Sequence, residues 1–170
     1  LYIYNKTEKR GFIDPLTSAY NRLYLNILKK NIHLRDYELC MIDIDYFKKI
    51  NDLYGHNTGD IVLQAFAKRI LNKIKKDDIL IRFGGEEFLL FISKSNHKKA
   101  YLVPERIRKE IEDTPIILDN EIINITASFG VNNKPFLSKS LNEAIKIADE
   151  ELYKAKRAGR NRVLSSHITE

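Results

Sequence analysis

The stretch Ile81-Arg82-Phe83-Gly84-Gly85-Glu86-Glu87-Phe88-Leu89-Leu90-Phe91 decides the fold, because it places two glycines and two glutamates between two apolar runs. Apolar, aromatic-rich segments on either side of a glycine pair are typical of a β-hairpin, since glycine adopts the positive φ that tight turns require. Successive side chains along a strand point in opposite directions, so we expect Glu86 and Glu87 to leave the turn differently. Such a turn suits a metal-bound polyphosphate; it also suits a surface hairpin with solvated acids.

The composition describes a globular protein of one domain. The chain has 170 residues, of which 44% are hydrophobic and 31% are charged. No apolar run approaches the roughly 20 residues of a membrane-spanning helix, and we find no signal peptide at the start of the sequence. The only cysteine, Cys40, cannot form an internal disulfide, which favours a reducing compartment. We therefore expect a cytoplasmic location for this domain, although the full-length protein could be attached to a membrane.

Positive charges are spread along the chain rather than gathered in one stripe. Lysine and arginine number 29 against 23 acidic residues, which gives a net charge of +6. A basic excess suits a nucleic acid or a nucleotide. The lysines lie in short separate groups without interleaved aromatic residues, so we expect no nucleic-acid partner, and a nucleic-acid-binding palm is the weaker interpretation.

Hydrophobic periodicity predicts helices interleaved with strands. Before the central hairpin we expect a helix, a buried strand and two helices, at residues 20–32, 38–45, 47–54 and 58–75. After it we expect a helix, a second hairpin, a helix and a short strand, at residues 96–113, 115–131, 141–158 and 162–164. This order predicts an α+β fold with a central, mostly antiparallel sheet and helices packed around it, similar to a palm.

Several details of these helices follow from capping and spacing. Thr58 and Ser140 are the expected N-caps of their helices, and Pro104 either kinks its helix or marks a late start. The second hairpin turns at Asp119-Asn120, and its second strand is expected to continue from Ile122 to Val131. Helical spacing places the following side chains on buried faces: Leu23, Ile27 and Leu28 in one helix, Ile61, Leu63, Phe66, Ile70 and Ile74 in another, and Leu141, Ala144, Ile145, Ala148 and Leu152 in the helix at residues 141–158.

Acidic side chains are expected at the end of the strand at residues 38–45. Asp43 and Asp45 fall on one face by the two-residue period, with the Ile44 carbonyl between them. Together with Glu86 or Glu87 they offer oxygen ligands, which suit Mg²⁺ or Mn²⁺, and phosphoryl chemistry often uses two such ions. An alternative for Asp45 is that it caps the following helix. Three cations could neutralise phosphates: Lys48, Lys156 and Arg160.

Gly84-Gly85-Glu86-Glu87-Phe88 resembles the defining motif of the GGDEF family of diguanylate cyclases, in a variant with glutamate at the third position. Further motifs match in the family's order along most of the chain: Asp14-Pro15-Leu16-Thr17, Asn21-Arg22, Asp43-Ile44-Asp45-Tyr46-Phe47-Lys48, Asn51-Asp52, Gly55-His56, Gly59-Asp60, Ser128-Phe129-Gly130-Val131, Ala148-Asp149 to Tyr153, Ala155-Lys156 and Gly159-Arg160-Asn161. The resemblance implies the palm-like fold of nucleotidyl cyclases and polymerases. It also implies the condensation of two GTP molecules into cyclic di-GMP, with release of two pyrophosphates.

The resemblance also assigns residues to the reaction. It implies that Asp43, the Ile44 carbonyl and Glu86 are the metal ligands, with two ions in each half-site. Glu86 would also help to deprotonate the attacking 3′-hydroxyl, and Glu87 would support the second ion or the hydroxyl. Lys48 would stabilise charge on the phosphates in the transition state. The remaining substrate-binding positions are Phe47, Asn51, His56, Asp60, Gly85, Lys156 and Arg160, of which the last two would hold the β and γ phosphates.

Asp60 has a chemical reason to favour guanine. Guanine presents N1–H and an amino group on one edge, a pair of donors that a carboxylate accepts, whereas adenine lacks both donors there.

A product with two equivalent phosphodiester bonds requires two half-sites that face each other, so we expect a homodimer, at least transiently. Membership would imply an upstream sensory or receiver domain in the full-length chain. We expect residues 1–12 to end a connector, residues 13–165 to form the catalytic domain and residues 166–170 to be a tail.

One family motif is degenerate in this sequence. The inhibitory product site of the family is an Arg-x-x-Asp motif, and the matching positions hold Lys75 and Asp78. Lysine cannot reproduce the planar fork with which arginine recognises guanine and phosphate, so we expect weak product inhibition or none. Lys156 and Arg160 also lie near a helix C-terminus, where cations are favourable in any protein. The alternative to an active cyclase is a domain that only binds GTP or cyclic di-GMP.

Overall fold

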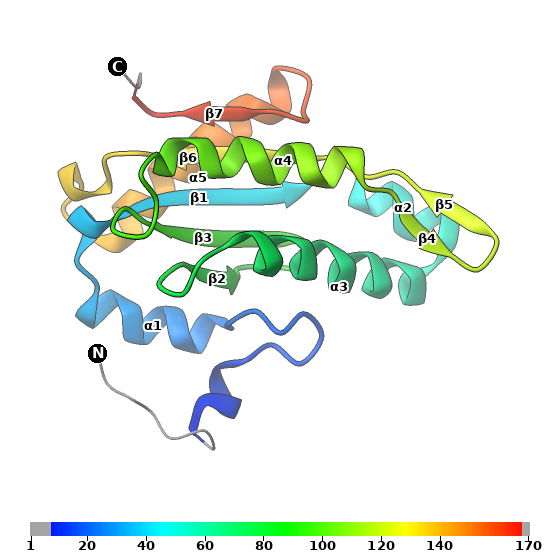
Figure 1. Cartoon of the computed structure of the whole chain (residues 1–170), viewed down its shortest axis with the longest axis horizontal. Coiled ribbons are helices and arrows are strands. Elements are labelled where there is room, and N and C mark those ends of the chain that lie inside the picture. The colour runs from blue at the N-terminus through cyan, green and yellow to red at the C-terminus, as the bar shows by residue number, and fades with distance from the viewer. Residues whose placement is uncertain (1–7, 168–170) are drawn as a thin grey trace.

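The centre of the molecule is a five-stranded sheet with the strand order β2-β3-β1-β6-β7 (Figure 1). This computed structural model describes residues 8–167, so the expected connector and tail lie partly outside the described residues. Neighbouring strands are antiparallel, except for β6 and β7, which are parallel. The α+β prediction is confirmed. The strands are β1 (Tyr37–Ile44), β2 (Ile79–Arg82), β3 (Glu87–Ser93), β6 (Ala127–Asn132) and β7 (Val163–Ser165).

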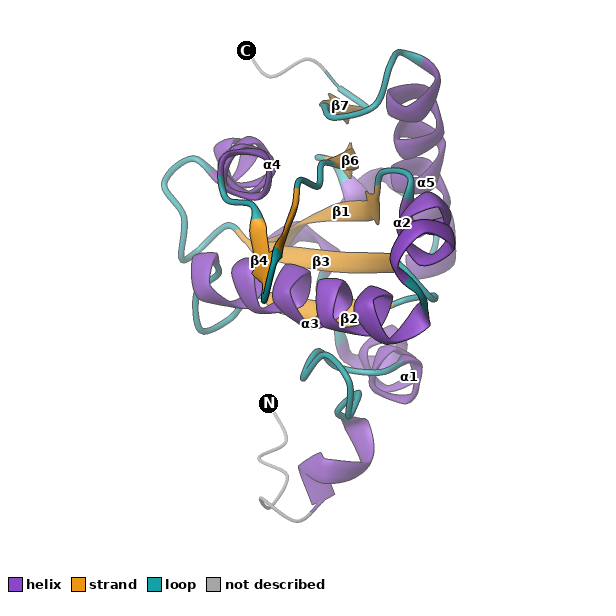
Figure 2. Cartoon of the chain, turned by 90° about the vertical axis from the view of Figure 1, so that its right-hand side faces the viewer, coloured by secondary structure: helices purple, strands orange, loops and turns teal. Residues whose placement is uncertain are grey.

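Helices cover both faces of this sheet, as Figures 1 and 2 show together. Side chains of β1 alternate between the faces: Leu39 and Met41 pack with one group of helices, and Cys40 and Ile42 pack with the other. By this alternation Asp43 belongs to the face of Met41. The first group is α1 (Arg22–Asn31) and α5 (Leu141–Arg157), and the second is α2 (Phe47–Tyr54), α3 (His56–Lys73) and α4 (Val103–Asp113).

The second hairpin differs from the prediction. Strands β4 (Ile116–Leu118) and β5 (Glu121–Ile123) form a separate two-stranded sheet, and β6 starts only at Ala127. The expected continuous strand from Ile122 to Val131 is therefore wrong. The backbone breaks because residues 124–126 serve the main sheet in another way: Ile125 is buried in the core, and the Thr126 carbonyl accepts the Asp45 N–H at 2.9 Å.

Helix starts were predicted with mixed success. The Ser140 side chain caps α5 as expected, by accepting the Glu143 N–H. Pro104 lies in the first turn of α4, so the late start is correct and the kink is not. Helix α3 begins at His56 after Gly55, whose φ is 88°, and no side chain caps it. The expectation that Thr58 caps this helix is wrong, because Gly55 alone separates α2 from α3 and the helix starts two residues before Thr58.

The predicted buried faces of two helices are only partly correct: Leu28 in α1 and Leu63, Phe66 and Ile70 in α3 are buried as expected. Leu23 is 60% exposed and Ile61 is 41% exposed, whereas Leu25 and Val62 are buried. Contact with the sheet selects the inner face, and apolar residues on more than one side of a helix leave periodicity ambiguous. In α5 every expected inward residue is buried: Leu141, Ala144, Ile145, Ala148 and Leu152.

Two further observations concern the environment of the chain. Cys40 is a free thiol and is buried in the core. Among the described residues, no helix combines the length and the apolar character that crossing a membrane demands.

Candidate functional site

The candidate site lies where β1 ends and β3 begins. Asp43, the next-to-last residue of β1, is paired across the sheet with Glu87, the first residue of β3. Residues directly opposite each other in an antiparallel pair present their side chains on the same face. On its other side Asp43 is paired with Ser128 of β6. The sheet register therefore brings together two acids that are separated by more than forty residues of sequence.

The Asp43 carboxyl is buried among other acids. It is 4% exposed, and burial raises its pKa to about 6, with further upward contributions from the charges of Glu86 and Glu87. The ammonium group of Lys156 binds its Oδ2 atom and acts in the opposite direction. Burial also raises the pKa of Glu87, helped by the nearby charge of Asp149. The arrangement concentrates negative charge that Lys156 only partly offsets.

The turn before β3 is held by two arginines. Arg82 donates from Nε and Nη2 to the Gly85 carbonyl at 3.2 and 3.0 Å, and it forms an ion pair with Asp14 at 3.2 Å. Arg22 donates to the Phe83 carbonyl at 2.9 Å and lies over the Phe83 ring. These contacts fix the backbone from which Glu86 and Glu87 project. Asp14 thus supports this turn through its ion pair with Arg82.

The glycine pair does not act as expected. Neither Gly84 nor Gly85 has a positive φ, so the prediction of left-handed glycines in this turn is wrong. A Cβ atom on Gly84 would lie 3.3 Å from the Glu87 carboxylate, closer than ordinary contact, whereas one on Gly85 would meet nothing within 4 Å. Gly84 leaves room for the Glu87 side chain, and Gly85 leaves the backbone open to a ligand.

A second part of the site lies between α2 and α3. The Asn51 Oδ1 atom is buried and makes no hydrogen bond. A Cβ atom on Gly59 would collide with this oxygen at 1.8 Å and would approach the Phe47 ring at 3.4 Å. Only glycine fits beside an amide that is held ready for an external donor. Three other predicted residues have exposed side chains on these helices: Lys48, His56 and Asp60.

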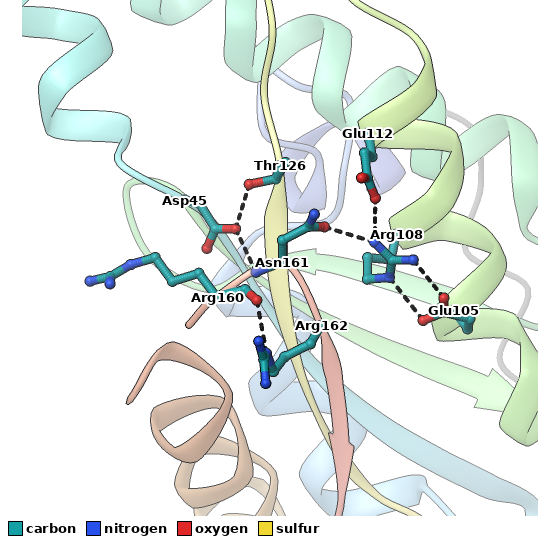
Figure 3. Close-up of polar contacts among 8 residues, drawn as sticks. All are labelled: Asp45, Glu105, Arg108, Glu112, Thr126, Arg160, Asn161 and Arg162. Carbon is teal, nitrogen blue, oxygen red and sulfur yellow. Dashed lines mark hydrogen bonds and ion pairs between the residues drawn. The ribbon is translucent and has the colours of Figure 1, made fainter. Parts of the chain in front are cut away.

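Asp45 does not cap α2. Tyr46 occupies the cap position with a φ of 55°, and no side chain caps the helix. The Asp45 carboxylate instead accepts hydrogen bonds from the Thr126 hydroxyl and from the backbone N–H of Asn161 (Figure 3). It also accepts a hydrogen bond from the Ser128 hydroxyl. The capping interpretation is therefore wrong, because the strand end directs this side chain toward β6 and the loop after α5.

The degenerate inhibitory motif is closed by internal contacts. Asp78 is 7% exposed, and its carboxylate accepts from the backbone N–H groups of Lys75 and Ser93 and contacts His97 Nε2, each at 2.7 Å. The Lys75 ammonium donates to the Asn96 carbonyl at 2.6 Å. Both oxygens of Asp78 therefore serve the fold.

The donor set fits a hard divalent cation that also binds substrate phosphates. Within residues 8–167, no three His, Cys, Asp or Glu side chains form a group that could hold a metal ion without other ligands. Asp43, the Ile44 carbonyl and Glu86 are all oxygen donors, and Mg²⁺ in proteins commonly takes one or two carboxylates and completes its shell with phosphates and water. The buried charge around Asp43, balanced only by Lys156, suits such an ion.

Sequence reasoning missed several residues that build the site. Arg22, Arg82 and Asp149 were not assigned to it, although Arg82 precedes the glycine pair and the other two lie within quoted motifs. Their effects pass through backbone carbonyls and long-range charge, which sequence spacing does not reveal. No local signal indicates the contact between Arg82 and Asp14, because the two residues are 68 positions apart in sequence.

Comparison with known families gives one match over most of the chain. The family model described as "Diguanylate cyclase, GGDEF domain" matches residues 11–162. The chain is 44% identical over 128 residues to diguanylate cyclase A of Treponema denticola, covering 75% of this chain and 34% of that protein. It is 37% identical over 159 residues to the response regulator PleD of Caulobacter vibrioides, covering 89% and 35% respectively. The chain thus spans about a third of the length of these curated relatives.

Solved structures of similar fold agree with this match. The GGDEF domain of DgcB from Caulobacter crescentus, solved in complex with c-di-GMP, has a TM-score of 0.82 and 29% identity, covering 99% of this chain and 98% of that one. Diguanylate cyclase SiaD from Pseudomonas aeruginosa, solved with its activator SiaC, has a TM-score of 0.84 and 32% identity, covering 94% and 64%.

Proposed function

The chain belongs to the GGDEF family of diguanylate cyclases, and from this premise we propose that it condenses two GTP molecules into cyclic di-GMP and two pyrophosphates. One observation carries the proposal. Asp43 of β1 is paired across the sheet with Glu87, the first residue of β3, and the charges of Glu87 and of the preceding Glu86 raise the pKa of Asp43. An accumulation of buried negative charge lowers stability, so it indicates a site kept for binding a cation.

Asp43, the Ile44 carbonyl and Glu86 would hold a divalent cation, Mg²⁺ or Mn²⁺, with two ions in each half-site. Such ions neutralise phosphate charge and lower the pKa of a bound hydroxyl. Lys156 would move from Asp43 to the phosphates, since its ammonium group already lies beside the proposed ion site. Arg160 would bind the phosphates with it, and Lys48 would stabilise the charge that develops on them.

Glu86 and Glu87 would handle the proton of the attacking 3′-hydroxyl. Burial raises the pKa of Glu87, which makes its carboxylate a stronger base than a solvated glutamate. Gly84 leaves the space in which this carboxylate lies. The exposed Gly85 backbone would allow the substrate to approach the turn closely.

The surface between α2 and α3 would select guanine. Asn51 offers a buried amide oxygen without a partner, and Asp60 would accept the donors of the guanine edge, with His56 beside it. Phe47 packs next to Asn51 and would shape the pocket floor. An adenine base would leave the acceptors of Asn51 and Asp60 unpaired, and this cost disfavours ATP.

Each chain would supply one half-site. Two chains would meet with their sites facing in a twofold homodimer, at least transiently, because the two new phosphodiester bonds are equivalent. We propose residues 13–165 as the catalytic domain, with an upstream sensory or receiver domain controlling this encounter in the full-length protein.

Product analysis tests the proposal directly. The chain is incubated with GTP and Mg²⁺ or Mn²⁺, with and without fusion to a dimerising coiled coil, and the products are separated by chromatography. We expect cyclic di-GMP in both samples and more of it in the fused one. Glu86→Ala should abolish it, whereas Glu121→Ala, which removes an exposed acid on β5, should not. GTP binding without any cyclic dinucleotide, even in the fused sample, would favour a binding module instead.

A further inference from the structure

We propose that Asp45 and Arg108 are positioning residues, which hold the loop at residues 159–161 so that the Arg160 guanidinium is presented to the substrate triphosphate. This inference rests on the proposed function, because it assigns Arg160 to the phosphates. It adds two residues that lie outside the proposed ligand set. Figure 3 shows the network that links them.

The backbone conformation of the loop at residues 159–161 requires stabilising contacts from outside the loop. Gly159, Arg160 and Asn161 have φ values of 119°, 64° and 44°, so three successive residues adopt the left-handed side of conformational space. Side-chain-bearing residues rarely adopt this conformation, and two in succession require outside contacts that favour it. The Arg160 N–H donates to the Ala155 carbonyl at 3.0 Å, which fixes the start of the loop to α5 but leaves Asn161 to other partners.

Asp45 holds the loop from the sheet side. Its Oδ2 atom accepts the Asn161 N–H at 3.0 Å and the Thr126 hydroxyl at 2.7 Å, and its Oδ1 atom accepts the Ser128 hydroxyl at 2.6 Å. The residue is 5% exposed, so these bonds form away from water and their geometry is well defined. The carboxylate thus joins the end of β1, the start of β6 and the residue directly after Arg160.

Arg108 of α4 holds the same residue from the opposite side. Its Nη1 atom donates to Asn161 Oδ1 at 2.8 Å, while Nε and Nη2 donate to Glu105 at 2.9 and 2.6 Å. Glu112 binds Nη1 as well. The two glutamates fix the planar guanidinium, whose rigid arrangement of donors suits it to orient a partner amide. Asn161 therefore lies between Asp45 at its backbone and Arg108 at its side chain.

The side chain of Arg160 leaves this network toward the proposed substrate side. Its guanidinium carbon lies 4.6 Å from the ring centroid of Tyr46, the residue next to Asp45, and in Figure 3 the side chain extends away from Arg108. One segment, Asp45-Tyr46, thus fixes both the backbone after Arg160 and its guanidinium. Lys156 precedes the loop on α5 and binds Asp43, so disturbing Asn161 should affect Arg160 and leave Lys156 in place.

A binding experiment separates positioning from a general effect on stability. Affinities for 3′-deoxy-GTP, which cannot condense, and for GMP are measured by titration calorimetry with Mg²⁺ present. The chains compared are the unchanged protein, Arg108→Ala, Arg160→Ala and the double variant. Since a charge-assisted contact to a phosphate contributes enough for about tenfold in affinity or more, Arg160→Ala should weaken 3′-deoxy-GTP binding by at least that factor. GMP, which lacks the β and γ phosphates, should bind equally to all four chains.

The double variant tests whether Arg108 acts through Arg160. If Arg108 acts through Arg160, Arg108→Ala should weaken triphosphate binding about threefold to tenfold, and the double variant should bind no more weakly than Arg160→Ala alone. Arg106→Ala removes an exposed arginine from the same helix and should change nothing. The inference would be overturned if the affinity losses of the two single variants multiplied in the double variant, or if GMP lost as much affinity as 3′-deoxy-GTP. It would also be overturned if Arg108→Ala left the affinity for 3′-deoxy-GTP unchanged.

A second variant covers the case in which Arg108→Ala fails to fold. Asn161→Gly keeps a residue that adopts the left-handed backbone and removes the side-chain hydrogen bonds to Arg108 and Glu112. It should show the same selective loss of triphosphate binding, and an unchanged preference for the triphosphate would count against the clamp. If the unchanged protein itself binds 3′-deoxy-GTP no better than GMP, both this inference and the proposed function are wrong. A normal preference that the variants do not alter refutes this inference only.

Discussion

The two ends of the β2–β3 hairpin carry acids in opposite circumstances. At the end that starts β2, Asp78 is surrounded by three internal partners, and both of its oxygens accept hydrogen bonds. At the other end, Glu86 and Glu87 join Asp43 in a cluster that one ammonium group only partly neutralises. The first end is complete without a ligand, and the second is not. The same residue type therefore marks an anchor at one end and a candidate site at the other.

A residue that matches a family motif can be explained by its contacts within the fold alone. Asp78 matches the aspartate of the family's inhibitory motif, yet its contacts within the fold already explain its presence. Asp43 has no comparable set of donors in the described residues, because its hydrogen-bond partner is Lys156. Its raised pKa shows that burial disfavours the charged carboxylate more than Lys156 stabilises it. Asp78 therefore needs no functional explanation, whereas a buried acid that lies beside two further acids indicates a cation site.

The largest effect is expected from Asp43→Asn. This change removes one charge from the proposed ion site and leaves a side chain of nearly the same shape. Cyclic di-GMP formation should fall by about 10³ or more, because stabilisation of the phosphates in the transition state depends on that charge. Product formation per folded molecule checks this, with circular dichroism as the control for folding. Activity within tenfold of the unchanged protein would break the contrast between the two ends.

At the other end of the hairpin, Asp78→Ala should act on stability. It leaves two backbone N–H groups and His97 without their buried acceptor, which costs about 2–4 kcal/mol of unfolding free energy. Urea denaturation measures the loss. Activity of the fraction that stays folded should remain within about twofold at low temperature. A variant that loses activity but keeps its stability would show that Asp78 serves a site after all.

A third buried acid, Glu38, should make the stability of the fold depend on pH. Glu38 is 5% exposed, its Oε2 atom has no hydrogen-bond partner, and burial raises its pKa to about 7, against a downward effect of Lys94. A carboxyl whose pKa is higher in the folded state favours folding when protonated, so stability falls as pH rises from about 4.5 to 7.

Glu38→Gln should therefore flatten the stability profile across that range. At pH 8 the variant should be more stable than the unchanged protein by up to about 3 kcal/mol, and at pH 4.5 the two should be similar. Thermal unfolding at several pH values measures the difference. By contrast, Asp78→Asn should destabilise the chain at both pH values, since the Asp78 carboxylate accepts hydrogen bonds from the backbone N–H groups of Lys75 and Ser93. A Glu38→Gln variant with no gain at high pH would contradict this account of the buried acid.

The smallest effect is expected for product inhibition. With Lys75 bound to the Asn96 carbonyl and Asp78 bound internally, micromolar cyclic di-GMP should reduce the initial rate by less than about twofold. Initial rates with added product measure this. Strong inhibition would show that Lys75 suffices at this turn or that the product binds elsewhere, and Lys75→Ala would separate the two.

Much of the fold follows from local sequence. The N-cap at Ser140 and the inner face of α5 were predictable, because a capping residue and apolar residues at helical spacing indicate them locally. The break between β5 and β6 was not, since Ile125 is apolar like Ile122 and Ile123 and only contacts with distant residues interrupt the strand at residues 124–126. The inner faces of α1 and α3 were predicted only in part, because Leu23 and Ile61 are apolar but exposed.

The site divides in the same way. The proximity of Asp43, Glu86 and Glu87 could be predicted from the strand ends and from a family resemblance. Antiparallel pairing of β1 with β3 places Asp43 opposite Glu87. The supports of the site could not. Arg82 acts through a backbone carbonyl, and Asp45 reaches an N–H group 116 residues away in sequence. Such contacts depend on the completed fold, which is why the capping role expected for Asp45 was wrong.

The account depends most on whether Asp43 and Glu86 bind one ion. Mn²⁺ affinity in the presence of 3′-deoxy-GTP, followed by electron paramagnetic resonance, tests this for the unchanged protein, Asp43→Asn, Glu86→Gln and the double variant. The account predicts that each single change weakens the tightest Mn²⁺ site at least about tenfold and that the double change adds little, because both acids serve one ion. Independent, multiplying losses, or a tight site that survives either change, would contradict it.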